Sequence, residues 1–233
     1  MIITVIHGAN HKGITYSMTK AVLDKLGGDN EVHEYFMPRD TPDYCTGCYN
    51  CFMKGEEYCP AAQKVQPIMK DMEKSDLIIL DSPCYCLEMS GSLKNLMDHF
   101  AYRWMSHRPH ASMFSKVALT VSSSAGAPPK SVTKSLSRQL KWMGVAKRYS
   151  FPLASMAENV TKLSDKKKIE IERKAERLAR KIAETKAKPS VVTKMMFYMF
   201  CAMQKNDKTA WNPTDRDWWK TQGFLDGKKP WKD

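Results

Sequence analysis

Short apolar runs that alternate with amphipathic stretches are the feature that most constrains the fold of this chain. The β-branched runs predict strands, and the stretches with a period near 3.6 residues predict helices. Alternation of this kind is typical of a parallel sheet with helices on both faces. The expected strands are Ile2–Ile6, Glu31–Phe36, Leu77–Leu80, Val117–Val121 and Arg148–Phe151, and the expected helices between them are Ser17–Leu26, Gln66–Lys74, Leu93–Met105 and Lys130–Met143.

The polarity of the runs predicts the order of the strands. The first, third and fourth runs are continuously apolar, as central strands covered on both faces are. Glu31–Phe36 is half polar and is expected at an edge. These features fit the doubly wound order 2-1-3-4-5.

The C-terminal part predicts a helical extension of this sheet domain. A charged helix is expected from about Ser164 to Thr185, and a more apolar helix rich in Met and aromatic residues over Ser190–Gln204. The tail beyond Ala210 carries several Trp residues, which is unusual for a disordered segment. We expect residues 1–186 to form the domain and residues 187–233 to pack on it or on a neighbouring subunit of a homodimer or homotetramer.

Charge and hydropathy indicate which partners and which cellular setting to expect for the chain. The net charge is +12, with −3 over residues 1–110 and +15 over residues 111–233. A basic half suits nucleic acid, a phosphate-rich cofactor or a solvated helix face, but no recognised nucleic-acid module is visible, so no nucleic-acid partner is expected. The longest apolar run, Met195–Met203, is too short for a membrane span, and the first residues lack the pattern of a signal peptide. A cytoplasmic protein is therefore expected.

Three loops follow the first, third and fourth strands, at the sheet edge where ligands of open α/β sheets bind. Residues 7–17 form a Gly-containing turn before a helix, which suits an anion such as a single phosphate. Residues 81–94 contain Pro83 and Tyr85, whose ring offers a face for a planar group. Residues 122–129 are small and admit a close approach of ligand to backbone.

Two of these loops carry the pattern Gly8-x-x-x-Lys12-Gly13-x-Thr15 and the pattern Ser82-Pro83-x-Tyr85-x-x-x-Met89-Ser90-Gly91-x-Leu93-Lys94. Over residues 1–150 the chain resembles the NADPH-dependent FMN reductases and iron–sulfur flavoproteins. The resemblance implies a flavodoxin-like fold, bound FMN and NAD(P)H as co-substrate, with residues 83–86 and Ser123–Gly126 beside the ring. The expected cofactor contacts are Gly8, Asn10, Lys12, Thr15, Ser17, Pro83, Cys84, Tyr85, Cys86, Ser123, Ser124 and Gly126.

Four cysteines form a further candidate site. Cys45, Cys48, Cys51 and Cys59 have the spacing C-x2-C-x2-C-x7-C. Four thiolates satisfy a [4Fe–4S] cluster, as in the iron–sulfur flavoproteins that the chain resembles, and they also satisfy zinc. Reduced or redox-active thiols without metal are the third alternative.

These features together predict an NAD(P)H-dependent FMN oxidoreductase with an unidentified acceptor. The chemistry belongs to the cofactor, so no catalytic side chain is expected. Two alternatives stay open: an FMN and iron–sulfur electron carrier without dedicated NAD(P)H turnover, and a non-catalytic flavin-binding protein.

Overall fold

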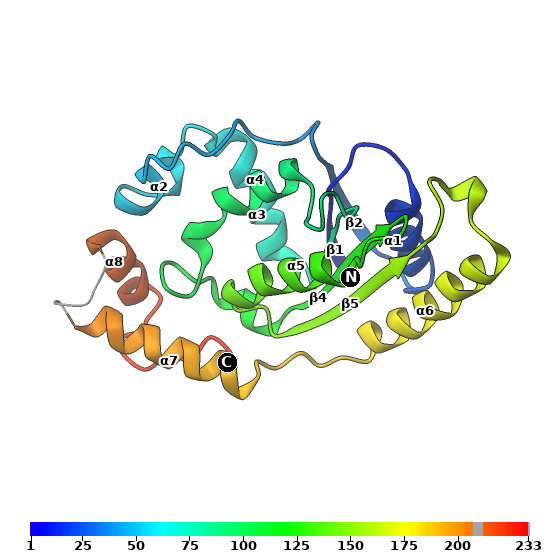
Figure 1. The fold of residues 1–233 in the computed structure, drawn as a ribbon. Helices are drawn as coiled ribbons and strands as arrows, with labels where there is room; N and C mark the ends of the chain where they lie inside the picture. The colour runs from blue at the N-terminus through cyan, green and yellow to red at the C-terminus, as the bar shows by residue number, and fades with distance from the viewer. Residues whose placement is uncertain (207–211, 233) are drawn as a thin grey trace.

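Five parallel strands form one sheet at the centre of the computed structural model, which describes residues 1–206 and 212–232. The strand order is β2-β1-β3-β4-β5, as predicted, and the fold is flavodoxin-like (Figure 1). Every residue of β3 and β4 is buried, whereas β2 at the edge is largely exposed. The strands are β1 (Ile2–His7), β2 (Glu31–Phe36), β3 (Leu77–Asp81), β4 (Val117–Ser124) and β5 (Lys147–Ala154).

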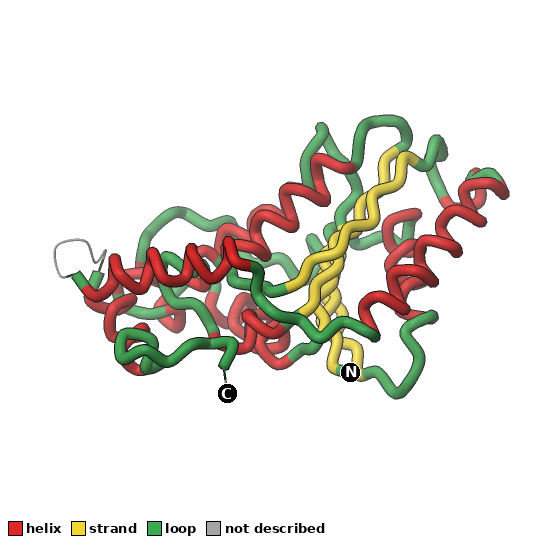
Figure 2. Tube along the Cα trace, turned by 90° about the horizontal axis from the view of Figure 1, so that it is seen from below, coloured by secondary structure: helices red, strands yellow, loops and turns green. Residues whose placement is uncertain are grey.

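Helices cover both faces of the twisted sheet (Figure 2). One core joins apolar side chains of α3 (Ala62–Lys74), α4 (Gly91–His99) and α5 (Lys130–Trp142) to one face. The opposite core joins α1 (Ile14–Asp24) and α6 (Asp165–Ala183) to the other face. The apolar stripe of α6 is buried in this second core, and its Lys and Arg residues face outward.

The C-terminal segment extends the molecule beyond the end of the sheet. It contains α7 (Val191–Lys205) and α8 (Pro213–Thr221), and α8 lies between α7 and the short α2 (Asn50–Met53) in Figure 1. A third core of buried side chains joins this segment to the loops between α4 and β4. Its buried members are Met105, Phe114, Phe197, Phe200, Cys201, Trp219 and Phe224. Among the described residues, no helix has the length and hydropathy needed to cross a bilayer.

Among the differences from the sequence expectation, two concern the elements around the strand ends. The helix expected over Leu93–Met105 ends at His99 and gives way to a 3-10 turn, Ala101–Arg103. The fourth strand does not end at Val121 but continues to Ser124, because β5 pairs with it along its whole length to Ala154. As a result, Ser123 and Ser124 belong to the end of a strand rather than to a loop.

Candidate functional site

The carboxyl ends of β1, β3 and β4 are joined by short hydrogen bonds. The Gly8 amide donates to the Asp81 carbonyl at 2.7 Å, and the Cys84 amide donates to the Ser123 carbonyl at 2.9 Å. The hydroxyls of Thr15 and Ser123 are 2.7 Å apart and buried. The three loops expected at this edge therefore form one connected surface at the point where the strand order reverses.

A cleft of about 410 Å³ opens at this edge, between the loops that follow β1 and β3. Its volume lies within the range of small-molecule and cofactor sites, roughly 300–1,000 Å³. The residues after the edge strand β2 close it on one side. The lining residues are Gly8, Ala9, Asn10, His11, Met37, Pro38, Tyr85, Ser90, Gly91 and Ser92.

Gly8 lets the first loop lie directly against the end of β3. A Cβ at this position would stand 2.8 Å from the Asp81 carbonyl oxygen and 3.0 Å from the Ser82 Cβ. Only a residue without a side chain fits between two backbones at this separation. The glycine thus allows the backbone of the first loop to pack against the carboxyl end of β3, where this backbone forms part of the cleft wall.

A tight hairpin presents Tyr85 to the cleft. The amides and carbonyls of Tyr85 and Glu88 bond to each other, and the two central residues, Cys86 and Leu87, have φ values of 49° and 68°. Side-chain-bearing residues rarely adopt this left-handed conformation, so the turn is strained. Half of the Tyr85 side chain is exposed, and its hydroxyl lies 3.3 Å from Nε2 of His11 on the opposite loop.

The start of α4 forms the floor of the cleft next to this hairpin. Ser90 caps the helix by accepting a hydrogen bond from the Leu93 amide, and its own amide donates to the Ser82 hydroxyl. Gly91 and Ser92 in the first turn line the cleft. The first amides of a helix have no intrahelical acceptor and favour an anion or an electron-rich ring edge.

A charged pair lies buried beneath the first loop. Nδ1 of His7 is 2.6 Å from Oδ2 of Asp81, and Nε2 is 3.1 Å from Oε1 of Glu34. Burial alone would lower the pKa of His7, but hydrogen bonds and negative charge from Asp81 and Glu34 outweigh it and raise that pKa. The imidazolium form is thereby favoured close to the turn that precedes α1.

The predicted contacts divide into three groups. Gly8, Asn10 and Tyr85 line the cleft. Thr15 and Pro83 line an adjoining space of about 10 Å³, no larger than one water molecule, against which the exposed His11 also lies. The linings of these two spaces do not include Lys12, Ser17, Cys84, Cys86, Ser123, Ser124 or Gly126.

His11 therefore controls the room available for a phosphate at the start of α1. A Cβ on Gly13 would stand 2.8 Å from the His11 ring, so the ring lies directly over that glycine. The His11 side chain is exposed, and its Nε2 lies 3.3 Å from the Tyr85 hydroxyl. With the side chains as placed, the cleft has the volume of a cofactor site, whereas the space beside Thr15 is too small for a phosphate.

Sequence reasoning missed Met37, Pro38 and the first turn of α4 as lining residues. Met37 and Pro38 follow β2, and the rule that ligands bind beyond the strand ends applies to that edge strand too. The sequence pattern Ser90-Gly91-Ser92 before an apolar run is a helix-start signal that places free amides there.

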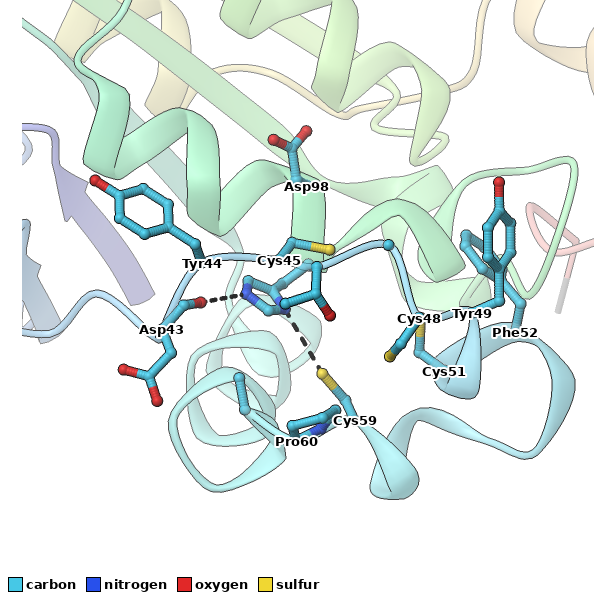
Figure 3. A pocket seen from close by; sticks show the side chains of 14 residues that line it. Asp43, Tyr44, Cys45, Cys48, Tyr49, Cys51, Phe52, Cys59, Pro60 and Asp98 are labelled. Atoms are coloured by element: carbon cyan, nitrogen blue, oxygen red, sulfur yellow. Dashed lines mark hydrogen bonds between the residues drawn. The ribbon is translucent and has the colours of Figure 1, made fainter.

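The second candidate site gathers the four cysteines. Cys45, Cys48, Cys51 and Cys59 all line one pocket of about 290 Å³, with aromatic side chains and Pro60 around it (Figure 3). Cys45 and Cys48 are exposed, whereas Cys51 and Cys59 are partly buried. Burial, reinforced by the neighbouring Cys59, raises the pKa of Cys51 to about 11, and burial raises that of Cys59.

The donor chemistry of this pocket fits a four-thiolate centre, but the side chains are not arranged as ligands. Within residues 1–206 and 212–232, no three His, Cys, Asp or Glu side chains are close enough together to hold a metal ion. His99 faces the pocket, with Nε2 donating to the Asp43 carbonyl and Nδ1 3.6 Å from Sγ of Cys59. A metal centre here requires the cysteine side chains to come closer together.

The helix α4 connects the two sites. Its first residues, Gly91 and Ser92, line the cleft at the sheet edge, and its last, Asp98 and His99, line the cysteine pocket. At a rise of about 1.5 Å per residue, the two ends of the helix are about 12 Å apart. Asn95 in the middle holds the cysteine loop, since its side chain accepts from the Cys45 amide and donates to the Pro42 carbonyl.

The fold and the cleft define a flavodoxin-like α/β protein with a cofactor-sized site at the topological switch point. The family model described as NADPH-dependent FMN reductase matches residues 1–159. The chain belongs to this family.

Relatives with curated names share part of the chain. An iron–sulfur flavoprotein of Archaeoglobus fulgidus is 29% identical over 134 residues, 57% of this chain and 59% of the relative. One of Clostridioides difficile is 32% identical over 102 residues, 42% and 45% of the two chains. The chain thus spans about half the length of the curated relatives that it matches.

A solved structure supports the same fold. The FMN-dependent NADH-azoreductase of Bacillus anthracis in complex with FMN superposes with a TM-score of 0.59 over 78% of this chain and 99% of that chain. Its sequence is 12% identical, so the likeness concerns the fold alone.

Proposed function

We propose that the protein is an FMN-dependent NAD(P)H oxidoreductase whose flavin lies in the cleft at the edge of the sheet. The observation that carries this proposal is the 410 Å³ cleft formed by the β1 and β3 loops, in a chain of the FMN reductase family. When bound, FMN supplies the redox chemistry by taking electrons from a reduced nicotinamide and releasing them to an acceptor.

The residues of the chain bind and orient the cofactor. The backbone around Gly8 and Asn10 and the amides at the start of α4 provide the polar wall, and the Tyr85 ring provides an aromatic one. Thr15 and Ser123 hold the first loop against β4. The remaining members of the proposed contact set are Lys12, Ser17, Pro83, Cys84, Cys86, Ser124 and Gly126.

Anaerobic mixing of the FMN-loaded protein with NADH or NADPH tests the reaction. The flavin absorbance should bleach with at least one of the two donors and return when a quinone is added. A bound flavin that neither donor reduces would contradict an NAD(P)H oxidoreductase and would leave a carrier or a non-catalytic flavin-binding protein.

A second function, electron transfer through FMN and a [4Fe–4S] cluster, is favoured by the four cysteines around one pocket and by the names of the two curated relatives. Cys45, Cys48, Cys51 and Cys59 would hold such a cluster. Iron and acid-labile sulfide in anaerobically purified protein, both lost in Cys51→Ser, would support it. Zinc in place of iron, or free thiols alone, would contradict it.

We also propose that the chain forms a homodimer or homotetramer through α7. Val191, Val192, Met195 and Met199 are between 52% and 72% exposed on this helix, and exposed apolar stripes of this kind mark interfaces. Light scattering of the wild type and of Met195→Lys tests this, since the charge should favour the monomer. The proposed setting is cytoplasmic, with small-molecule or protein acceptors.

A further inference from the structure

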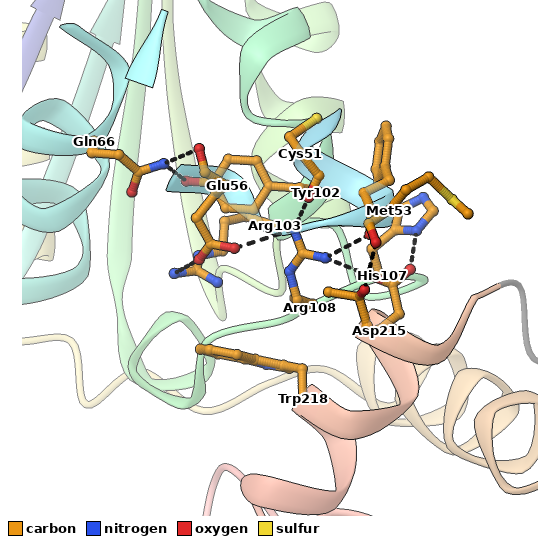
Figure 4. A network of polar contacts seen from close by, with 12 residues as sticks. Cys51, Met53, Glu56, Gln66, Tyr102, Arg103, His107, Arg108, Asp215 and Trp218 are labelled. Carbon is orange, nitrogen blue, oxygen red and sulfur yellow. Dashed lines mark hydrogen bonds and ion pairs between the residues drawn. The ribbon is translucent and has the colours of Figure 1, made fainter. Parts of the chain in front are cut away.

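A buried ionic network joins helix α8 to the cysteine-bearing segment (Figure 4). Arg108 lies at its centre and is 2% exposed. Its guanidinium pairs with Oδ1 of Asp215 at 2.9 Å, and Asp215 in α8 is fully buried. The same guanidinium donates to the carbonyls of Cys51 and Phe52.

The pairing of Arg108 with Asp215 therefore fixes the backbone of a proposed cofactor ligand. A buried guanidinium needs charged or hydrogen-bonding partners. These partners restrict the positions that the guanidinium can take. With Asp215 in place, the Arg108 donors are directed at the two carbonyls of α2. Without it, the guanidinium keeps Glu56 as a partner at 3.1 Å but loses the contact that directs it at α2.

A second contact joins α8 to the same short helix. The Thr214 hydroxyl donates to the Met53 carbonyl at 2.9 Å. Met53 is the last residue of α2 and follows Cys51 by two positions. Two neighbouring residues of α8 thus contact three successive carbonyls of the cysteine segment, two of them through Arg108.

A third contact reaches the stretch that leads to Cys59. Glu56 pairs with both Arg103 and Arg108, at 3.0 Å and 3.1 Å. The Arg103 guanidinium lies over the ring of Trp218 from α8, with 4.7 Å between its central carbon and the ring centroid. Helix α8 is therefore connected to α2 and, through Arg103 and Arg108, to Glu56 in the stretch between Cys51 and Cys59.

We propose that helix α8 (Pro213–Thr221) is a clamp that sets the shape of the four-cysteine segment, with Arg108 and Asp215 as the positioning residues. The redox role of those cysteines rests on the proposed function, but the clamp itself is a property of the chain. In an open clamp, residues 51–59 lose the anchors that keep Cys51 and Cys59 partly buried. The proposal predicts that these two thiols become accessible when the clamp is broken.

Alkylation of each cysteine by iodoacetamide, measured by mass spectrometry on the full-length protein after chelator treatment, tests the clamp. In Asp215→Asn, Cys51 and Cys59 should react about tenfold faster, the effect of a ~1.4 kcal/mol loss in the free energy of local opening. Cys84, partly buried beside the cleft, should keep its rate. Asp217→Asn is the matched control, because Asp217 is an exposed residue of the same helix.

Unchanged rates at Cys51 and Cys59 in Asp215→Asn would overturn the proposal. If Cys84 accelerates equally, the variant opens the whole chain, and Thr214→Val then decides, since it removes only the hydroxyl that donates to Met53. A Cys51 rate raised about threefold in Thr214→Val, the effect of one hydrogen bond, supports the clamp, and an unchanged rate overturns it. Neither result depends on whether the protein binds FMN or iron.

Discussion

The hydroxyls of Thr15 and Ser123 lie 2.7 Å apart, in a buried contact between residues 108 positions apart in the chain. Thr15 stands in the first turn of α1, and Ser123 near the end of β4. Their contact fixes the first loop relative to the strand that carries the third loop. The proposed FMN site depends on this connection, because its walls come from separate loops.

Removing one of these hydroxyls should weaken both the fold and the site. In Thr15→Val the Ser123 hydroxyl loses its buried partner, and the free energy of unfolding should fall by about 1–3 kcal/mol. Urea unfolding measures this loss. Thr161→Val is the control, since the exposed Thr161 hydroxyl donates to the neighbouring Asn159 side chain and its loss should cost little.

Gly8→Ala should reduce the affinity for FMN about tenfold or more, a loss of ~1.4 kcal/mol. The added Cβ meets the Asp81 carbonyl at 2.8 Å and pushes the first loop away from β3. Flavin fluorescence titration measures the change. Ser115→Ala changes an exposed residue just before the start of β4, at the opposite end of the sheet, and it should bind as the wild type does. Equal affinities in the two variants would show that the position of the first loop is unimportant.

Stability should depend on pH through His7. Its pKa is raised above the ordinary value of 6.5, because Asp81 and Glu34 outweigh the effect of burial. The folded state thus holds the proton more tightly than the unfolded state. The stabilisation is complete below about pH 6.5 and is lost as the pH rises through the raised pKa.

Comparing the free energy of unfolding of wild type and His7→Gln between pH 5 and pH 9 isolates this effect. The difference between the two proteins should shrink as the pH rises, because the wild type loses the charged interaction that the variant lacks. A constant difference across the range would mean that His7 does not change its protonation on unfolding.

Trp219→Ala should destabilise the protein by about 3–5 kcal/mol, the usual cost of removing a fully buried large aromatic side chain. Trp219 is 0% exposed in the third core, and its indole donates to the His107 carbonyl. Lys220→Ala on the exposed side of α8 should change stability by less than about 0.5 kcal/mol. Thermal unfolding of both variants checks whether the C-terminal segment unfolds together with the sheet domain.

The sheet could be predicted from the sequence because its signals are local. Continuous apolar runs marked β1, β3 and β4 as central, and the polar residues of Glu31–Phe36 marked the edge. The helix after β3 was predicted six residues too long, since its end is set by tertiary contacts. Asn95 and His99 bind the cysteine loop, and Arg103 pairs with Glu73 beyond the helix end.

The site was predictable only in outline. The Gly8 turn and the Tyr85 loop carry sequence patterns, and the structure places both at the cleft. The contact of His11 with Tyr85 joins residues 74 positions apart, and no local pattern encodes it. Helix α8 was missed although Asn212-Pro213 is a local helix-start signal, and its packing depends on distant partners, since Asp215 contacts His107 and Arg108 more than a hundred residues earlier.

Hydrogen exchange with and without saturating FMN tests the central claim most directly. The account predicts that FMN slows exchange in residues 8–15, 83–92 and 122–126, whose backbones form the edge of the sheet at the switch point. Residues 45–59 around the cysteines should keep their rates. Protection confined to other segments, or the absence of saturable FMN binding, would contradict the placement of the cofactor in this cleft.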